Sequence, residues 1–212
     1  MCPSSRYNGA NGVIVRVCPP SLYRSIVPQL AVLLKSCIDS NITMNFLQPF
    51  SLEDASEFWL AAEESVIQGK ELVMIAQEDT KEPVTEIIEG SGEPSNDMTH
   101  DPSTQPPVVL GCVILYLAQT PNAKHRGEVG KLIVHQEHRK RKIGKMLLDC
   151  LEDEARKDGR TIIILDTQTG SGAEKFYEHI GYCKVGVGVI PDASLAPDGK
   201  RYTSCTFFYK KL

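Results

Sequence analysis

A short β-branched run, a basic turn and an amphipathic segment follow one another directly in the second half of the chain. The run ends at Val134, the turn reads RKRK over residues 139–142, and the segment 143–156 is predicted to be a helix. That prediction rests on apolar residues at helical spacing, which are Ile143, Met146, Leu147, Cys150, Leu151 and Ala155. A turn that opens a helix leaves N–H groups unpartnered at the positive end of the helix dipole. The five cationic side chains between Arg139 and Lys145 strengthen its preference for an anion such as a pyrophosphate.

A second aliphatic run follows this helix. Gly159 is expected to end the helix, and residues 161–165 predict a strand that is buried on both faces of a sheet. A strand, a helix and another strand at this spacing predict a right-handed βαβ unit. Such units bind ligands at the carboxyl ends of their strands, where the basic turn and Asp166 are both expected to lie.

The basic turn alone leaves other interpretations open. RKRK also fits a nuclear-localisation signal, a nucleic-acid patch or a solvated turn, and the single glycine at Gly144 is a weak phosphate-loop signal. The net charge is −4, and residues outside 81–107 carry +1, because that segment holds six acidic residues and one lysine. This balance does not favour a general nucleic-acid binder, so no nucleic-acid partner is expected.

The basic turn and the start of the helix resemble the cofactor motif of the GNAT superfamily of acetyl-CoA-dependent N-acetyltransferases. The motif is Arg or Gln, two residues, Gly, one residue, and Gly or Ala, and Arg139, Lys142 and Gly144 occupy its three positions. Lys142 replaces a glycine. The loop must therefore either tolerate a Cβ at this position or use the lysine as an added phosphate contact.

A second GNAT signature lies further along the chain and is supplied by Ala173, Phe176, Tyr177, Gly181 and Tyr182. Gly170 stands where the family often has an asparagine, so the usual contacts of that asparagine are lost or replaced. The chain is also similar to the tabtoxin-resistance branch of the superfamily, and this similarity covers most of it apart from residues 80–107. The stretches that carry the similarity are 46–49, 58–59, 128–132, 165–170, 191, 197–199 and 206–212.

The resemblance implies a mixed α/β (α+β) fold, with a mostly antiparallel central sheet flanked by helices and a βαβ cofactor-binding unit. It implies acetyl-CoA as cofactor, with coenzyme A as product. The backbone of residues 132–134 is expected to bond the pantetheine arm as an added strand would. The residues expected to bind the cofactor are Leu132, Ile133, Val134, Arg139, Lys140, Arg141, Lys142, Ile143, Gly144, Lys145, Met146, Thr169, Gly172, Ala173 and Phe176.

The resemblance also implies three catalytic residues. An alkylamine with a pKa of ~10 is protonated at neutral pH, so a base must take its proton before it can attack. Glu128 and Asp166 match the proposed acid and base pair of the tabtoxin-resistance branch, and Tyr177 matches the tyrosine that protonates the departing thiolate. Structural alternatives are an Asp166 that orders the following loop, a Glu128 paired with Lys131 or Arg126, and a Tyr177 that is simply buried.

Five further strands and two further helices are predicted. The strands are 13–17, 72–77, 108–117, 184–190 and 202–209, the last two joined by a turn at Pro197, Asp198 and Gly199. One helix covers 21–40 and is expected to kink or split at Pro28. The other begins at a capping box of Ser51 and Asp54 and ends at Gly69, with a buried stripe that includes Leu52. The apolar loop 41–50 is expected either to wall the acceptor site or simply to pack on the core.

Composition sets the remaining expectations. At 212 residues and 42% hydrophobic content, the chain is expected to form a single domain over 1–212. Residues 81–107 predict a disordered acidic insertion in a hairpin loop, with a regulatory or partner-binding role as the alternative. Seven scattered cysteines favour the cytoplasm, and RKRK leaves the nucleus open. No apolar run approaches ~20 residues, so no membrane partner is expected. No metal site is expected, because His125, His135 and His138 lack metal-ligand spacing.

The function expected from the resemblance is acetyl transfer to the primary amine of a small molecule, of amino-acid-like, β-lactam or polyamine type, by direct transfer in a ternary complex. The alternatives are a protein lysine or N-terminal acetyltransferase and a non-catalytic acetyl-CoA-binding module. Lys142 and Gly170 motivate the non-catalytic alternative. The acceptor is left unidentified, and a homodimer is left open.

Overall fold

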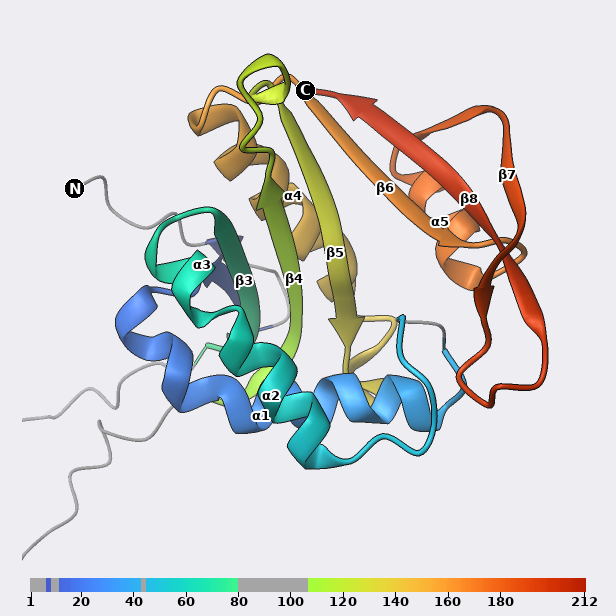
Figure 1. The fold of residues 1–212 in the computed structure, drawn as a ribbon. Coiled ribbons are helices and arrows are strands. Elements are labelled where there is room, and N and C mark those ends of the chain that lie inside the picture. The colour runs from blue at the N-terminus through green and yellow to red at the C-terminus, as the bar shows by residue number, and fades with distance from the viewer. Residues whose placement is uncertain (1–6, 9–11, 43–44, 80–106) are drawn as a thin grey trace, which may run out of the picture.

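One mixed sheet forms the centre of the computed structural model, which describes residues 7–8, 12–42, 45–79 and 107–212 (Figure 1). Its strands are β1 (Tyr7–Asn8), β2 (Val13–Val17), β3 (Glu71–Glu78), β4 (Val109–Leu117), β5 (Arg126–Val134), β6 (Ile162–Gln168), β7 (Cys183–Leu195) and β8 (Tyr202–Lys211). Their order is β1-β2-β3-β4-β5-β6-β8-β7. The β5–β6 pair is parallel, whereas the other neighbouring pairs are antiparallel. The mixed, mostly antiparallel sheet is therefore confirmed. The predicted insertion lies outside the described residues except for Pro107.

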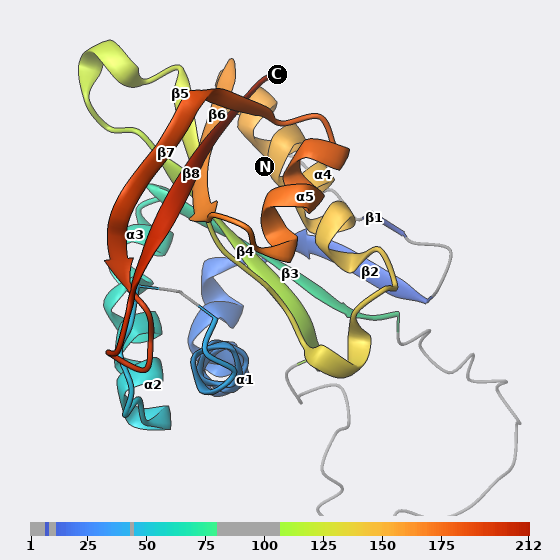
Figure 2. The same ribbon diagram turned by 90° about the vertical axis from the view of Figure 1, so that its right-hand side faces the viewer.

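Helices cover both faces of this sheet (Figure 2). One face carries α1 (Pro20–Asp39), α2 (Leu52–Ala61) and α3 (Glu63–Ile67), and the other carries α4 (Ile143–Lys157) and α5 (Gly172–His179). Short 3-10 turns lie at Pro121–Ala123 and Gln136–His138. The helix α4 connects the parallel strands β5 and β6, so the predicted βαβ unit is present.

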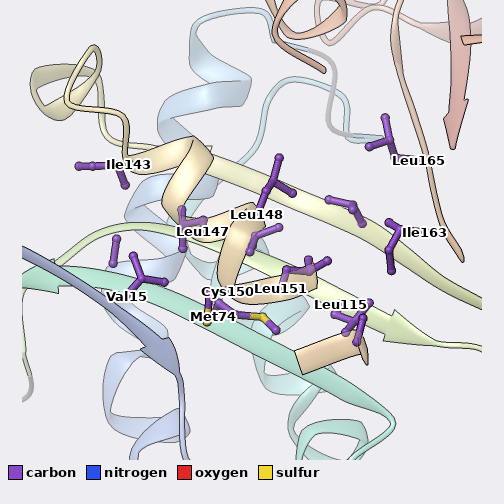
Figure 3. Close-up of a cluster of buried hydrophobic side chains, with 14 of the residues drawn as sticks. Val15, Met74, Leu115, Ile143, Leu147, Leu148, Cys150, Leu151, Ile163 and Leu165 are labelled. Atoms are coloured by element: carbon purple, nitrogen blue, oxygen red, sulfur yellow. The ribbon is translucent and has the colours of Figure 1, made fainter. Parts of the chain in front are cut away.

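The predicted apolar stripe of α4 fixes this helix against the sheet. Leu147 and Leu151 are fully buried against Met74 and Leu115 (Figure 3). Each fully buried leucine contributes about 1.5–3 kcal/mol to stability. The basic turn that precedes α4 is therefore attached to a rigid element.

Two predicted helices differ in detail from the structure. The helix α1 runs through Pro28 without interruption, so the predicted split is wrong. Its buried face continues on both sides of the proline, at Val27 and Leu30, and keeps both halves on the sheet. The capping box that opens α2 is confirmed by a bond of 3.0 Å from the Asp54 amide to the Ser51 hydroxyl. However, this helix breaks at Ala62 into α2 and α3.

The strands β5 and β6 pair over only three residues before they diverge (Figure 1). Arg126–Glu128 lie opposite Ile162–Ile164, and β6 then continues along β8 as far as Gln168. Asp166 consequently lies inside β6, not at its end as predicted. Burial on both faces is also wrong for this strand, because only alternate residues such as Ile163 and Leu165 are buried.

Candidate active site

A cavity of about 640 Å³ lies where β5 and β6 separate. Residues from β5, β6, α4, α5 and the end of α1 line it. The structure therefore brings together side chains from segments that are far apart in the sequence. The predicted site residues in its lining are Glu128, Leu132, Ile133, Val134, Arg139, Gly144, Asp166, Gly172, Ala173, Phe176 and Tyr177.

The remaining predicted cofactor residues lie outside this lining. Ile143 is only 1% exposed, so its side chain belongs to the core, and Met146 packs against the same core. Lys145 pairs with Asp149 at 2.6 Å, whereas Lys140 and Lys142 are exposed. Ile143 can therefore offer a bound anion only its backbone N–H, because its side chain is buried.

Arg141 and Thr169 hold loops that border the cavity. The Arg141 guanidinium lies 3.8 Å from Glu78 and 3.1 Å from Nδ1 of His138. The Thr169 and Thr206 hydroxyls are 2.8 Å apart. Both residues are therefore placed to support the site from outside it.

The turn before α4 presents unpartnered donors. Lys142 is the N-cap of α4, and neither a side-chain cap nor an acidic residue in the first turn is present there. Lys142 has φ 62°, a left-handed conformation that favours the glycine of the family motif. The loop therefore accommodates a Cβ at this position, and the N-terminus of α4 keeps its affinity for an anion.

A bulge in β5 changes the direction of the strand beside the cavity. Ile114 pairs with Gly130, whereas Cys112 pairs with Ile133, so β5 carries an extra residue at this point. Lys131 lies in the bulge with φ 49°. Beyond Glu128 the edge of β5 that faces β6 has no strand partner among the described residues. That edge can therefore pair with an extended ligand.

Glu128 and Asp166 lie on the same face of the sheet. Glu128 is in register with Ile164, and Asp166 follows two residues later, so its side chain projects from the same face. Partial burial raises the pKa of Glu128, and the Asp166 carboxylate raises it further, while Arg126 lowers it. A carboxylate whose pKa is raised towards neutrality is a better proton acceptor for catalysis.

Tyr177, the third predicted catalytic residue, lines the same cavity as these carboxylates. It is 6% exposed and packs against the rings of Tyr182 and Phe208, whose centroids are 5.6 and 6.0 Å away. Burial and the charge of Asp166 both raise the pKa of Tyr177. Its phenol therefore stays protonated at neutral pH and is available as a proton donor.

The sequence did not single out Tyr116 as a member of the site. Tyr116 lies directly opposite Glu128 in the β4–β5 ladder and lines the cavity. Burial raises the pKa of Tyr116, and Glu71 and Glu128 raise it further. Its position depends on the register between two strands, for which the sequence gives no direct signal.

Lys131 is a second residue of the lining that the sequence did not assign to the site. Its ammonium lies 5.0 Å from the ring centroid of Phe46 and 5.2 Å from that of Phe58. Burial lowers the pKa of Lys131, whereas Asp166 raises it. For the apolar loop 41–50, which was predicted either to wall the acceptor site or to pack on the core, the structure shows both: Ile42 and Asn45 line this cavity, whereas Phe46 and Phe50 pack on the core.

The loop between α1 and α2 is fastened to the turn between β7 and β8. The Gln48 amide donates to the Pro197 carbonyl at 2.7 Å, and the Asp198 amide donates to the Asn41 side chain at 3.2 Å. The Gly199 amide donates to the Ala196 carbonyl at 2.8 Å, so the turn predicted at residues 197–199 is present. These contacts hold together two loops that come from opposite ends of the chain.

Comparison with known proteins identifies the family. The model of the acetyltransferase (GNAT) family matches residues 42–182, more than half of the chain, and the chain therefore belongs to this family. It is an acetyltransferase, and its cofactor is acetyl-CoA. The predictions of enzyme class and cofactor are confirmed.

Three solved structures share this fold at low sequence identity. A GCN5-related N-acetyltransferase from Kribbella flavida has a TM-score of 0.66 at 16% identity, covering 95% of this chain and 98% of that one. A Salmonella typhimurium protein whose structure contains its cofactor acetyl-CoA has a TM-score of 0.65 at 15% identity, covering 95% of both chains. A ribosomal-protein-alanine N-acetyltransferase from Brucella melitensis has a TM-score of 0.61 at 17% identity, covering 93% and 99%.

Two features are absent from the described residues. None of their helices is both long and apolar enough to span a membrane. Nor do His, Cys, Asp or Glu side chains gather there in a group of three or more that could hold a metal ion.

Proposed function

We propose that this cavity transfers the acetyl group of acetyl-CoA to the primary amine of a small molecule, by direct transfer in a ternary complex. The amine is of amino-acid-like, β-lactam or polyamine type. One observation carries the proposal: Glu128, Asp166 and Tyr177 line the same cavity as Val134 and Gly144 of the cofactor segment.

The residues around the cavity fit the cofactor. The N-terminus of α4 offers N–H groups to a pyrophosphate, and the edge of β5 at 132–134 offers backbone groups to the pantetheine arm. A Cβ on Gly144 would lie 3.5 Å from the Phe176 ring, so only a small residue keeps this part of the cavity open. Acetyl-CoA, when bound, supplies an acetyl group that is activated as a thioester.

The side chains divide the proton transfers between them. Glu128 takes the proton of the acceptor amine, directly or through water, because its raised pKa brings it closer to neutrality. Asp166 supports this role through its charge, which favours the protonated form of Glu128 once the proton has been taken. Tyr177, whose pKa is also raised, keeps its proton until a thiolate is released.

The fastened loops bear on the size of the acceptor. The contacts between Gln48 and Pro197 and between Asn41 and Asp198 join the two loops beside the acceptor side of the cavity. Because the α1–α2 loop borders the cavity through Ile42 and Asn45, fastening it to the β7–β8 turn limits the room for a folded protein as acceptor. This favours a small molecule over a protein lysine or an N-terminus, and the complete set of acid and base groups weighs against a non-catalytic module.

Further parts of the proposal rest on the sequence. We place the chain in the tabtoxin-resistance branch, and we expect a single domain over 1–212 with the segment 81–107 as a disordered insertion. A cytoplasmic location, with the nucleus as the alternative, and a homodimer complete the proposal. Light scattering behind a sizing column tests the oligomeric state.

The test of this function joins a binding and a turnover experiment on the full chain. Acetyl-CoA is titrated calorimetrically, and release of the coenzyme A thiol is then followed with amino acids, polyamines, β-lactam amines and short peptides. Release with one class of small amine is the expected result. Release with peptides alone would favour a protein acetyltransferase, and tight binding without release on any amine would contradict a catalytic role.

A further inference from the structure

The cavity has two chemically different sides. On one side Gly144 and Phe176 accompany the basic turn of α4, where the proposed function places the cofactor. On the other side the lining continues to Lys131, whose ring neighbours Phe46 and Phe58 pack against the α1–α2 core. The second side is therefore where the acceptor is expected, and it contains a lysine.

Two features fix the ammonium of Lys131 in this place. The bulge in β5, with φ 49° at Lys131 itself, sets the direction in which the side chain leaves the strand. The rings of Phe46 and Phe58, both near 5 Å from the ammonium, attract it electrostatically. An ammonium has three N–H donors, so it can be shared between protein partners and a ligand.

The charges around Lys131 match an acceptor that carries both signs. Asp166 acts electrostatically on Lys131 and on Glu128, so all three groups share one neighbourhood. The amine of an amino acid would face the carboxylates, and its own carboxylate would face Lys131. A polyamine would instead bring a second cation close to Lys131, where like charges repel.

We propose that Lys131 binds a carboxylate on the acceptor, which makes the acceptor an amino acid rather than a polyamine. This inference rests on the proposed function, because it assigns the acceptor class of the same site. Partial burial of Lys131 strengthens the interaction, since an anion that arrives beside a poorly solvated ammonium compensates for its lost hydration. Lys131 is in this account a specificity residue, and the proton transfers remain with Glu128 and Tyr177.

The experiment compares acceptors that differ only in the carboxylate. Amino acids and ω-amino carboxylates are each assayed beside their primary amides, with spermidine as the polyamine, on the wild type and on Lys131→Met, Lys131→Arg and the exposed control Lys124→Met. Methionine keeps an apolar stem between the two rings. We expect Lys131→Met to lose roughly 10–100-fold in kcat/KM on the acid, chiefly through KM, because a charge-assisted hydrogen bond is lost. We expect the rate on the amide to stay within about twofold and the arginine variant to keep the preference for the acid.

Two results would overturn the proposal. An equal loss on the acid and on the amide would mean that Lys131 acts only through the catalytic carboxylates. A wild type that prefers the amide or spermidine would exclude carboxylate recognition. Because this comparison needs only the wild type, it tests the proposal even if a variant fails to fold. If acetyl-CoA binds but no amine is acetylated, the proposed function fails. Calorimetry of the acid and amide pairs on the coenzyme A complex then tests Lys131 by itself, and equal affinities would contradict its role.

Discussion

Glu128 and Asp166 lie diagonally across the parallel strands β5 and β6, at the position where these strands separate. The in-register partner of Glu128 is Ile164, and Asp166 follows two residues later on the same face. A continuous β5–β6 ladder would have left no gap between the two strands. Because pairing stops at Glu128, both carboxylates line the cavity instead.

Removing either carboxylate should slow the reaction without lowering the affinity for acetyl-CoA. We expect Glu128→Gln to lower kcat by about 10²–10⁴-fold, the usual contribution of a general base, and Asp166→Asn to lower it less, because Asp166 acts through its charge on Glu128. The affinity for acetyl-CoA should stay within about twofold in calorimetry, since neither side chain belongs to the proposed cofactor contacts. Glu178→Gln, on the exposed side of α5, is the matched control. Full activity in both site variants would refute the two-carboxylate scheme.

The pH dependence should respond to Arg126. This residue lowers the pKa of Glu128, so Arg126→Gln raises that pKa and leaves less of the carboxylate deprotonated at a given pH. The acidic limb of kcat/KM should therefore move to higher pH. Lys124→Gln removes a nearby exposed cation and should leave the limb in place. A limb that moves equally in both variants would point to a general charge effect and not to Glu128.

Lys142 offers a test of backbone strain at the cofactor turn. A left-handed conformation costs an L-residue about 1–2 kcal/mol, and replacing Lys142 by glycine removes this cost. Part of the resulting gain in stability is offset by the greater freedom of glycine in the unfolded chain. Lys142→Gly should therefore raise the free energy of unfolding by up to about 1 kcal/mol. Lys142→Ala keeps the Cβ and should show no such gain in urea denaturation. If acetyl-CoA affinity falls equally in both variants, the lysine side chain is itself a phosphate contact.

The segment between β3 and β4 should be dispensable. Gln77 pairs with Val109, and the Gln29 side chain accepts from the Val109 amide at 2.8 Å, which holds the start of β4 independently of the segment. Deleting 83–106 should leave the melting temperature within a few degrees of the wild type and turnover unchanged. Loss of cooperative unfolding in thermal scans would show that the segment is structural.

Local signals in the sequence predicted the helix α4 and the start of the helix α2. The helical spacing from Ile143 to Ala155 depends only on neighbouring residues, as does the capping box at Ser51 and Asp54, and both are present in the structure. The passage of α1 through Pro28 was not predictable locally, because tertiary burial on both sides of the proline decides it.

The candidate site was predicted only in part, for a physical reason. Motifs located Gly144 and Tyr177, since spacing along one turn or helix is enough to recognise them. Tyr116 and Lys131 enter the cavity through strand register and a bulge, which depend on how distant strands align. Sequence position alone carries little information about such an alignment.

A calorimetric titration of three proteins tests whether the cavity at the start of α4 holds acetyl-CoA. A Cβ at Gly144 meets the Phe176 ring at 3.5 Å, an ordinary contact, so Gly144→Ala should fold normally and bind acetyl-CoA nearly as tightly as the wild type. Gly144→Glu adds bulk and a negative charge beside the phosphates and should abolish detectable binding while the protein still unfolds cooperatively. Wild-type affinity in Gly144→Glu would contradict the assignment of the cavity.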